Sequence, residues 1–130
     1  MKPFLKPLLI IIGIIQIVLM GLPPLLASQT TADLFGVEHA TNFEEWARWC
    51  GMANIMWGLL LIGISVDPVR NKIVVMFSII FYLFCLVLTL MMMFWFGELN
   101  PALWTWWIPV VFPAIFFILL IVYYPKERAV

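Results

Sequence analysis

Four long apolar stretches dominate the sequence, at about residues 7–27, 50–66, 73–96 and 103–124. The hydrocarbon core of a bilayer is about 30 Å thick, and a helix needs about 20 residues to cross it. The first, third and fourth stretches meet this length, whereas the second is short unless its helix begins earlier. Only 11% of the 130 residues are charged, too few to cover a water-soluble domain, for which about a quarter is usual. We therefore predict an all-α membrane protein: a single domain over residues 1–130, with four transmembrane helices in an antiparallel up-down bundle.

The segment before the second stretch carries a helix-start signal. Thr41 and Glu44 have the spacing of a capping box, with Thr41 as the N-cap. Glu44 and Arg48 are also placed i, i+4 in the favourable order of charges. These signals predict one helix over residues 42–66, extended on its outer side. The alternative is a separate interfacial helix that places Trp46 and Trp49 among the lipid headgroups.

Positive charges mark one side of the predicted membrane protein. With four helices, all cationic residues except Arg48 fall on the same side: Lys2, Lys6, Arg70, Lys72, Lys126 and Arg128. The positive-inside rule then predicts a multi-pass protein of the cytoplasmic (inner) membrane with both termini in the cytoplasm. Trp95, Trp104, Trp106 and Trp107 form the aromatic belt at the outer interface on this prediction.

Small and polar residues lie on one stripe of each of the first three helices. The stripes are Gly13, Gln16 and Met20; Gly51, Asn54, Gly58 and Ser65; and Ser78, Tyr82, Cys85 and Thr89. In membranes such residues mark helix contact faces, so we expect these stripes to face inward. The helical rise places Gln16 and Tyr82 about 14 Å, and Asn54 and Cys85 about 18 Å, from the inner boundary. Four polar side chains are thus predicted to converge near the midplane.

The fourth helix adds backbone acceptors to this layer. Pro109 and Pro113 have no N–H, so the carbonyls of Thr105 and Pro109 are expected to lose their usual donors and the helix to kink. One interpretation of the layer is hydrogen bonding that fixes the packing. The other is a cavity for an amphipathic ligand such as a quinone or a lipid. The candidate ligand-binding residues are Gln16, Asn54, Tyr82, Cys85 and Pro109. Because the layer contains no Asp, Glu, His or Arg, proton-driven transport is disfavoured.

The outer loop offers one candidate metal site. His39 and Glu38, with Glu44, supply an imidazole and carboxylates that can bind a divalent ion. Their spacing matches no H-E-x-x-H motif, and a solvated loop is expected to carry such residues in any case. The formal net charge of zero gives no attraction to nucleic acid, so no nucleic-acid partner is predicted.

Three segments carry a family resemblance: Leu9-Ile10-Ile11-Ile12-Gly13, Leu34-Phe35-Gly36 and Gly51-Met52-Ala53-Asn54-Ile55-Met56-Trp57-Gly58. Together with a first helix that ends in prolines, they resemble the DoxX-like and BphX-like groups of small four-helix bacterial membrane proteins. The resemblance implies an accessory or quinone-proximal role and assigns no catalytic residue.

Three functional hypotheses follow. The favoured one is a non-catalytic accessory subunit of a larger redox or photosynthetic membrane complex, surrounded by lipids and by other membrane subunits or further copies of itself. The second is a membrane binding protein for a hydrophobic small molecule such as a quinone or a lipid. The third is a metal-dependent membrane enzyme with its site at His39.

Overall fold

The computed structural model describes residues 4–34, 43–95, 97, 102 and 104–126, and these residues form an all-α protein. In chain order the elements are α1 (Leu5–Ile15), a π-helical segment η1 (Gln16–Gly21), α2 (Leu22–Leu26), α3 (Ser28–Leu34), α4 (Phe43–Ile64), α5 (Lys72–Phe94), a 3₁₀ segment η2 (Trp104–Trp107) and α6 (Ile108–Val122). Four stretches are long and apolar enough to cross a membrane: Leu5–Leu26, Glu45–Ile64, Lys72–Phe94 and Trp104–Val122. The predicted all-α fold with four membrane-spanning helices is confirmed.

The second span is one continuous helix. α4 begins at Phe43 and runs to Ile64 without a break, so the prediction of an extended helix is confirmed over the described residues. Trp46 and Trp49 lie in its first two turns with exposed side chains. Thr41, the predicted N-cap, lies outside the described residues.

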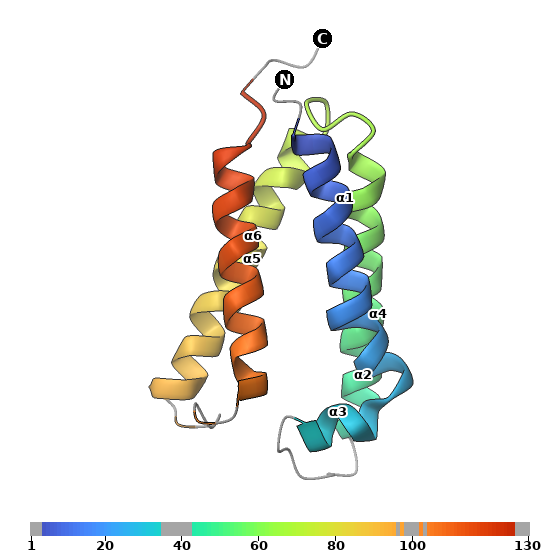
Figure 1. The fold of residues 1–130 in the computed structure, drawn as a ribbon, viewed down its shortest axis with the longest axis vertical. Helices are drawn as coiled ribbons and strands as arrows, with labels where there is room; N and C mark the ends of the chain where they lie inside the picture. Colours follow the sequence, from blue (N-terminus) through green and yellow to red (C-terminus); the bar gives the residue numbers. More distant parts are fainter. Residues whose placement is uncertain (1–3, 35–42, 96, 98–101, 103, 127–130) are drawn as a thin grey trace. The chain divides into compact units, whose positions relative to one another are not determined.

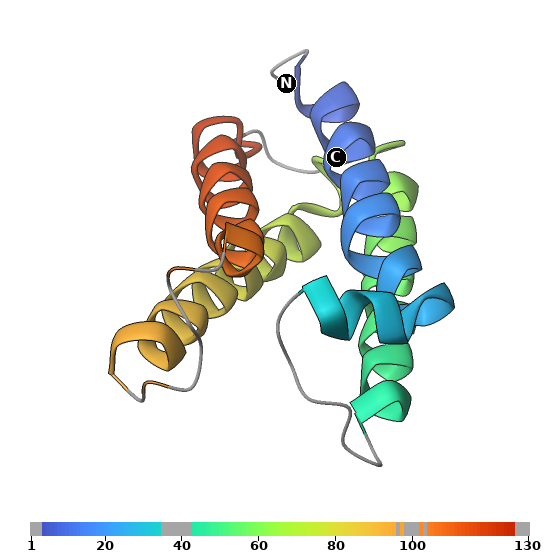
Figure 2. The same cartoon turned by 60° about the horizontal axis from the view of Figure 1, so that its bottom comes forward.

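The chain divides into two compact units. The N-terminal unit, Lys6–Asp67, pairs the first span (α1, η1 and α2) with α4, and α3 packs beside the same helix (Figures 1 and 2). The C-terminal unit consists of Pro68–Val130 together with Met1–Leu5, and in it α5 packs against α6. Each unit is therefore an antiparallel pair of membrane-spanning helices.

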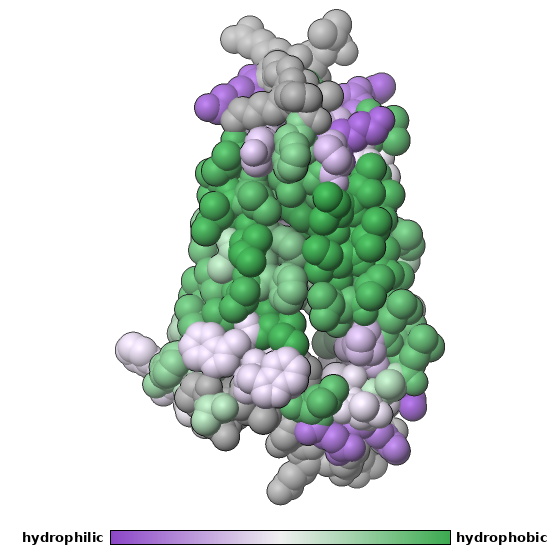
Figure 3. Space-filling model, in the orientation of Figure 1, coloured by the Kyte–Doolittle hydropathy of each residue, from purple (hydrophilic) through white to green (hydrophobic). Residues whose placement is uncertain are grey.

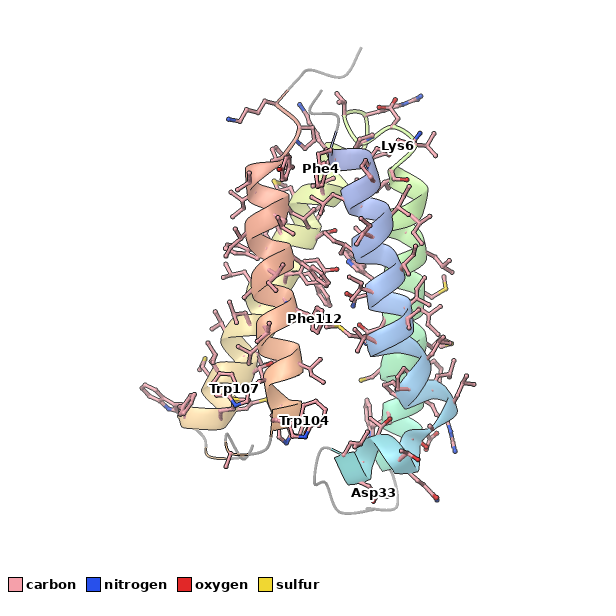
Figure 4. The ribbon with its side chains drawn as sticks, in the orientation of Figure 1. Phe4, Lys6, Asp33, Trp104, Trp107 and Phe112 are labelled. Atoms are coloured by element: carbon pink, nitrogen blue, oxygen red, sulfur yellow. The ribbon has the colours of Figure 1, made fainter. Side chains whose placement is uncertain are left out.

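Charged and aromatic residues lie at the ends of these pairs. In the N-terminal unit, Lys6 and Asp33 lie at opposite ends of the helix pair (Figure 4). In the C-terminal unit, Trp104 and Trp107 lie at the end opposite Phe4, whose ring stacks on Tyr123 at 5.3 Å between centroids. The polar ends and apolar middle are those of a bilayer-spanning protein.

Large apolar side chains cover the outward helix faces. Phe77, Phe84 and Leu88 on α5 are exposed, as are Met56 and Leu59 on α4. The space-filling view shows hydrophobic residues along the flanks of the helices and hydrophilic ones at their ends (Figure 3). A water-soluble protein rarely exposes so continuous an apolar surface, whereas a bilayer requires one. The chain is a multi-pass membrane protein.

Two elements of the N-terminal unit were not predicted. The segment expected to be a loop from residue 28 instead forms α3, in which Ser28 and Ala32 are buried. The first span was expected to be uniformly α-helical, but its middle is the π-helical η1. Only Leu22 separates η1 from Pro23 and Pro24, which lack the N–H groups that would continue the α-helical hydrogen bonds.

Candidate functional site

The first span and α4 approach each other through two reciprocal pairs of glycines. A Cβ atom added to Gly58 would lie 2.6 Å from the carbonyl oxygen of Gly13, and one added to Gly13 would lie 2.6 Å from the carbonyl oxygen of Gly58. A Cβ atom added to Gly51 would similarly lie 2.5 Å from the carbonyl oxygen of Gly21. The two backbones are thus in direct contact at both levels, which only glycine permits.

An amide pair lies between these glycine contacts. Gln16 donates a hydrogen bond from Nε2 to Oδ1 of Asn54. Asn54 in turn donates from Nδ2 to the backbone oxygen of Cys50, 2.9 Å away and one turn earlier in α4. Gln16 is only 1% exposed, and Asn54 is half-buried. The prediction that these two polar stripes face inward is confirmed for Gln16, Asn54 and the glycines around them.

The π-helical segment explains how Gln16 and Gly21 both face α4. In an α-helix, residues five apart are rotated by about 140° from each other. In η1 the hydrogen bonds run from residue i to residue i+5, as in the bond from the Leu22 N–H to the Ile17 oxygen. The wider turn makes the rotation between residues five apart much smaller than in an α-helix. Gln16 and Gly21 are accordingly the buried residues of η1. Gly21 was missed from the sequence because α-helical spacing places it on another face.

The polar stripe of α5 is the buried face of that helix. Ser78 and Tyr82 are both almost fully buried, and the ring of Tyr82 packs edge-on against Phe116 of α6 at 5.2 Å. The hydroxyl of Ser78 donates to the backbone oxygen of Val74, 2.8 Å away. The hydroxyl of Thr89 donates to the backbone oxygen of Cys85, 2.7 Å away. Both hydroxyls are therefore satisfied by their own helix.

The five candidate ligand-binding residues are divided between the two units. Gln16 and Asn54 meet in the N-terminal unit, while Tyr82, the half-buried free Cys85 and Pro109 belong to the C-terminal unit. Convergence of all five on one layer stays a prediction.

Pro109 and Pro113 occupy different positions in the fourth helix. Pro109 lies in the first turn of α6, where a helix has no internal partner for an N–H, and only Pro113 lies inside the helix. The residues before α6, Trp104–Trp107, form the 3₁₀ segment η2, so the fourth span is not α-helical throughout. The expected loss of donors for the carbonyls of Thr105 and Pro109 stays a prediction.

The candidate metal site lies in the part of the chain that is not described. Glu38 and His39 are outside the described residues, and the side chain of Glu44 is also outside them. Among the described residues, no three His, Cys, Asp or Glu side chains come together in a way that could hold a metal ion. A site at His39 stays a prediction.

Comparisons with protein-family models, with curated proteins and with solved structures find no match to this chain. The resemblance to the DoxX-like and BphX-like groups stays a prediction. What the described site can do chemically is limited to hydrogen bonding, since neither carboxamide of the Gln16–Asn54 pair ionises.

Proposed function

We propose that this membrane protein is a non-catalytic accessory subunit, which packs against other proteins of a larger membrane complex. The observation that carries the proposal is the closure of the Gln16–Asn54 pair by glycine contacts on both sides. A ligand between the first span and α4 would need space at this level. Backbone contact at Gly13–Gly58 and at Gly21–Gly51 removes that space above and below the pair.

The other polar groups inside the spans support the same role. The hydroxyls of Ser78 and Thr89 donate to backbone oxygens of their own helix, and that of Ser65 donates to the last turn of α4. Side chains used in this way stabilise helices and helix contacts, and they offer no acid, base or nucleophile for a reaction. The exposed apolar faces of α4 and α5 supply surface for neighbouring proteins. The family resemblance favours an accessory role close to a quinone. We propose a redox or photosynthetic complex of the inner membrane as the assembly.

Purification from the native membrane in a mild detergent tests the proposal. The tagged protein is expected to migrate as a discrete assembly with other polypeptides, identified by mass spectrometry of the intact particle. A lone protomer or homo-oligomer that carries a stoichiometric quinone or lipid would contradict the accessory role and favour the ligand-binding hypothesis. A metal that disappears in the His39→Ala variant would favour the enzyme hypothesis.

A matched variant separates packing from ligand binding. Replacing both Gln16 and Asn54 by leucine removes the amide pair and keeps side chains of similar size at both positions. The accessory role predicts that this double variant still enters the assembly. A binding protein that uses these amides to hold its ligand is expected to lose that ligand in the same variant.

A further inference from the structure

The first span contains backbone carbonyls that its own helix cannot satisfy. The carbonyl of Leu19 would accept from residue 23 in α-helical spacing and from residue 24 in π-helical spacing. Both positions are prolines, which have no N–H. Leu19 therefore has no donor at either spacing within the described helix.

The carbonyl of Val18 also lacks a donor from its own helix, for a related reason. The α-helical donor for Val18 is the N–H of Leu22, but that group donates to the oxygen of Ile17. The π-helical donor would be residue 23, which is Pro23. Two successive carbonyls, those of Val18 and Leu19, thus lack the usual donors of their own helix.

The residues that carry these carbonyls are not the ones of η1 that are buried against α4. The side chain of Val18 is 54% exposed and that of Leu19 is 41% exposed, whereas Gln16 and Gly21 are the residues of η1 that face α4. Ile14, Val18 and Leu22 are exposed at i, i+4 spacing, which makes a ridge of the kind that packs into the groove of another helix.

Depth decides which donor fits. Leu19 precedes the end of the candidate span at Leu26 by seven residues, which corresponds to about 10 Å along the helix from its outer end. The hydrocarbon core contains no donors, and an unsatisfied carbonyl there is costly. Donors on lipid headgroups remain at the interface, so they fit this depth poorly. Side chains of a transmembrane helix can reach any depth.

We infer that the carbonyls of Val18 and Leu19 form an acceptor site for a hydrogen-bond donor on a transmembrane helix of a partner subunit. The donor is a hydroxyl or carboxamide side chain placed about 10 Å below the outer end of that helix. The ridge of Ile14, Val18 and Leu22 supplies the packing contacts around it. This inference rests on the proposed function and names the contact through which the chain would join its complex.

The carbonyl of Leu19 can be observed directly. Labelling with carbonyl-¹³C leucine and ¹⁵N methionine marks only two peptide bonds, Leu19–Met20 and Leu90–Met91. Leu90 lies inside α5 and serves as the internal control, because the N–H at its α-helical donor position belongs to Phe94 of the same helix. The full-length protein is reconstituted in lipid vesicles and titrated with a poly-leucine transmembrane peptide that carries one asparagine about 10 Å from one end.

The Leu19 carbonyl signal is expected to move downfield with the asparagine peptide and to stay unchanged with a matched all-leucine peptide. The Leu90 signal is expected to stay unchanged with both. In a Pro23→Ala/Pro24→Ala variant the new N–H groups satisfy the carbonyl, so its signal should already lie downfield and should not respond. The Leu26→Ala variant replaces an exposed side chain and keeps both prolines, so its Leu19 signal is expected to respond like that of the wild type.

Three results would overturn the inference: a Leu19 signal at the hydrogen-bonded position before any peptide is added, an equal response to both peptides, or no response. Purification from native membranes distinguishes failure of this inference from failure of the proposed function. A Pro23→Ala/Pro24→Ala variant that remains in a large assembly would refute the acceptor site and keep the accessory role. Absence of any assembly for the wild type would refute the accessory role, while the vesicle titration would still decide whether the acceptor site exists.

Discussion

Single glycines set the distance between the first span and α4. A second glycine of α4, which makes no such contact, serves as the control for this claim. Gly58 faces the backbone of Gly13, whereas Gly63 has no neighbouring atom within 4 Å of an added Cβ. Gly58→Ala is expected to destabilise the protein by about 1–3 kcal/mol, because the backbone contact must open. Gly63→Ala is expected to be neutral or to stabilise α4 by up to about 1 kcal/mol through helix propensity. Unfolding in mixed detergent micelles, followed by circular dichroism, measures the difference. Equal effects of the two variants would contradict the backbone contact.

The Gln16–Asn54 pair gives a second prediction at this scale. Gln16→Leu alone removes the donor to Oδ1 of Asn54. This single variant is expected to lower the stability by about 0.6–2 kcal/mol. The double variant Gln16→Leu/Asn54→Leu removes both polar groups and is expected to lose less than the single variant. The same unfolding assay compares them. A double variant that loses the sum of both single losses would show that the pair does not interact.

Much of this residue-level arrangement could be predicted from spacing. Gln16 and Asn54 were placed on inward stripes because they recur at α-helical intervals with Gly13, Gly51 and Gly58, and the hydrogen bond confirms it. Gly21 could not be predicted in this way, since it lies five residues after Gln16 and meets α4 only through the π-helical turn.

The aromatic contact between α5 and α6 is expected to stabilise the protein, whereas the exposed faces of these helices are expected to contribute little. Phe116 is buried and contacts both Tyr82 and Phe112, with ring centroids 5.2 Å and 5.9 Å apart. Phe116→Ala is expected to lose about 1 kcal/mol or more, because both aromatic contacts disappear. Ile118→Ala on the exposed side of the same helix is expected to change stability little. Thermal unfolding in detergent, followed by tryptophan fluorescence, measures both. Comparable losses would contradict packing of this face against α5.

The four spans could be predicted because a long apolar segment in a bilayer must satisfy its own backbone hydrogen bonds, which a helix does. The capping signal before residue 44 and the apolar run that follows also predicted one continuous α4. α3 and η1 could not be predicted by the same reasoning. Ser28–Leu34 has neither the length nor the apolar content of a span, and Pro23-Pro24 fits the end of a helix as well as it fits a change in hydrogen bonding.

For the whole molecule, the charge pattern predicts both termini on the cytoplasmic side. Single cysteines at Asp33→Cys and Lys126→Cys, in a background without Cys50 and Cys85, test this in intact cells. Both native positions are exposed, so a membrane-impermeant maleimide can reach the new thiols. The cysteine at position 33 is expected to react from outside, and that at position 126 only after permeabilisation. The reverse pattern would contradict the predicted orientation.

The antiparallel glycine contacts also bear on how the chain enters the membrane. α4 is the least apolar of the four spans, and Asn54 lies in its middle, so α4 alone is a poor substrate for insertion. Its partner Gln16 belongs to the span synthesised before it, and the two helices fit backbone to backbone. The first span is therefore expected to favour insertion of α4, because Gln16 offers the amide of Asn54 a hydrogen-bond partner inside the bilayer.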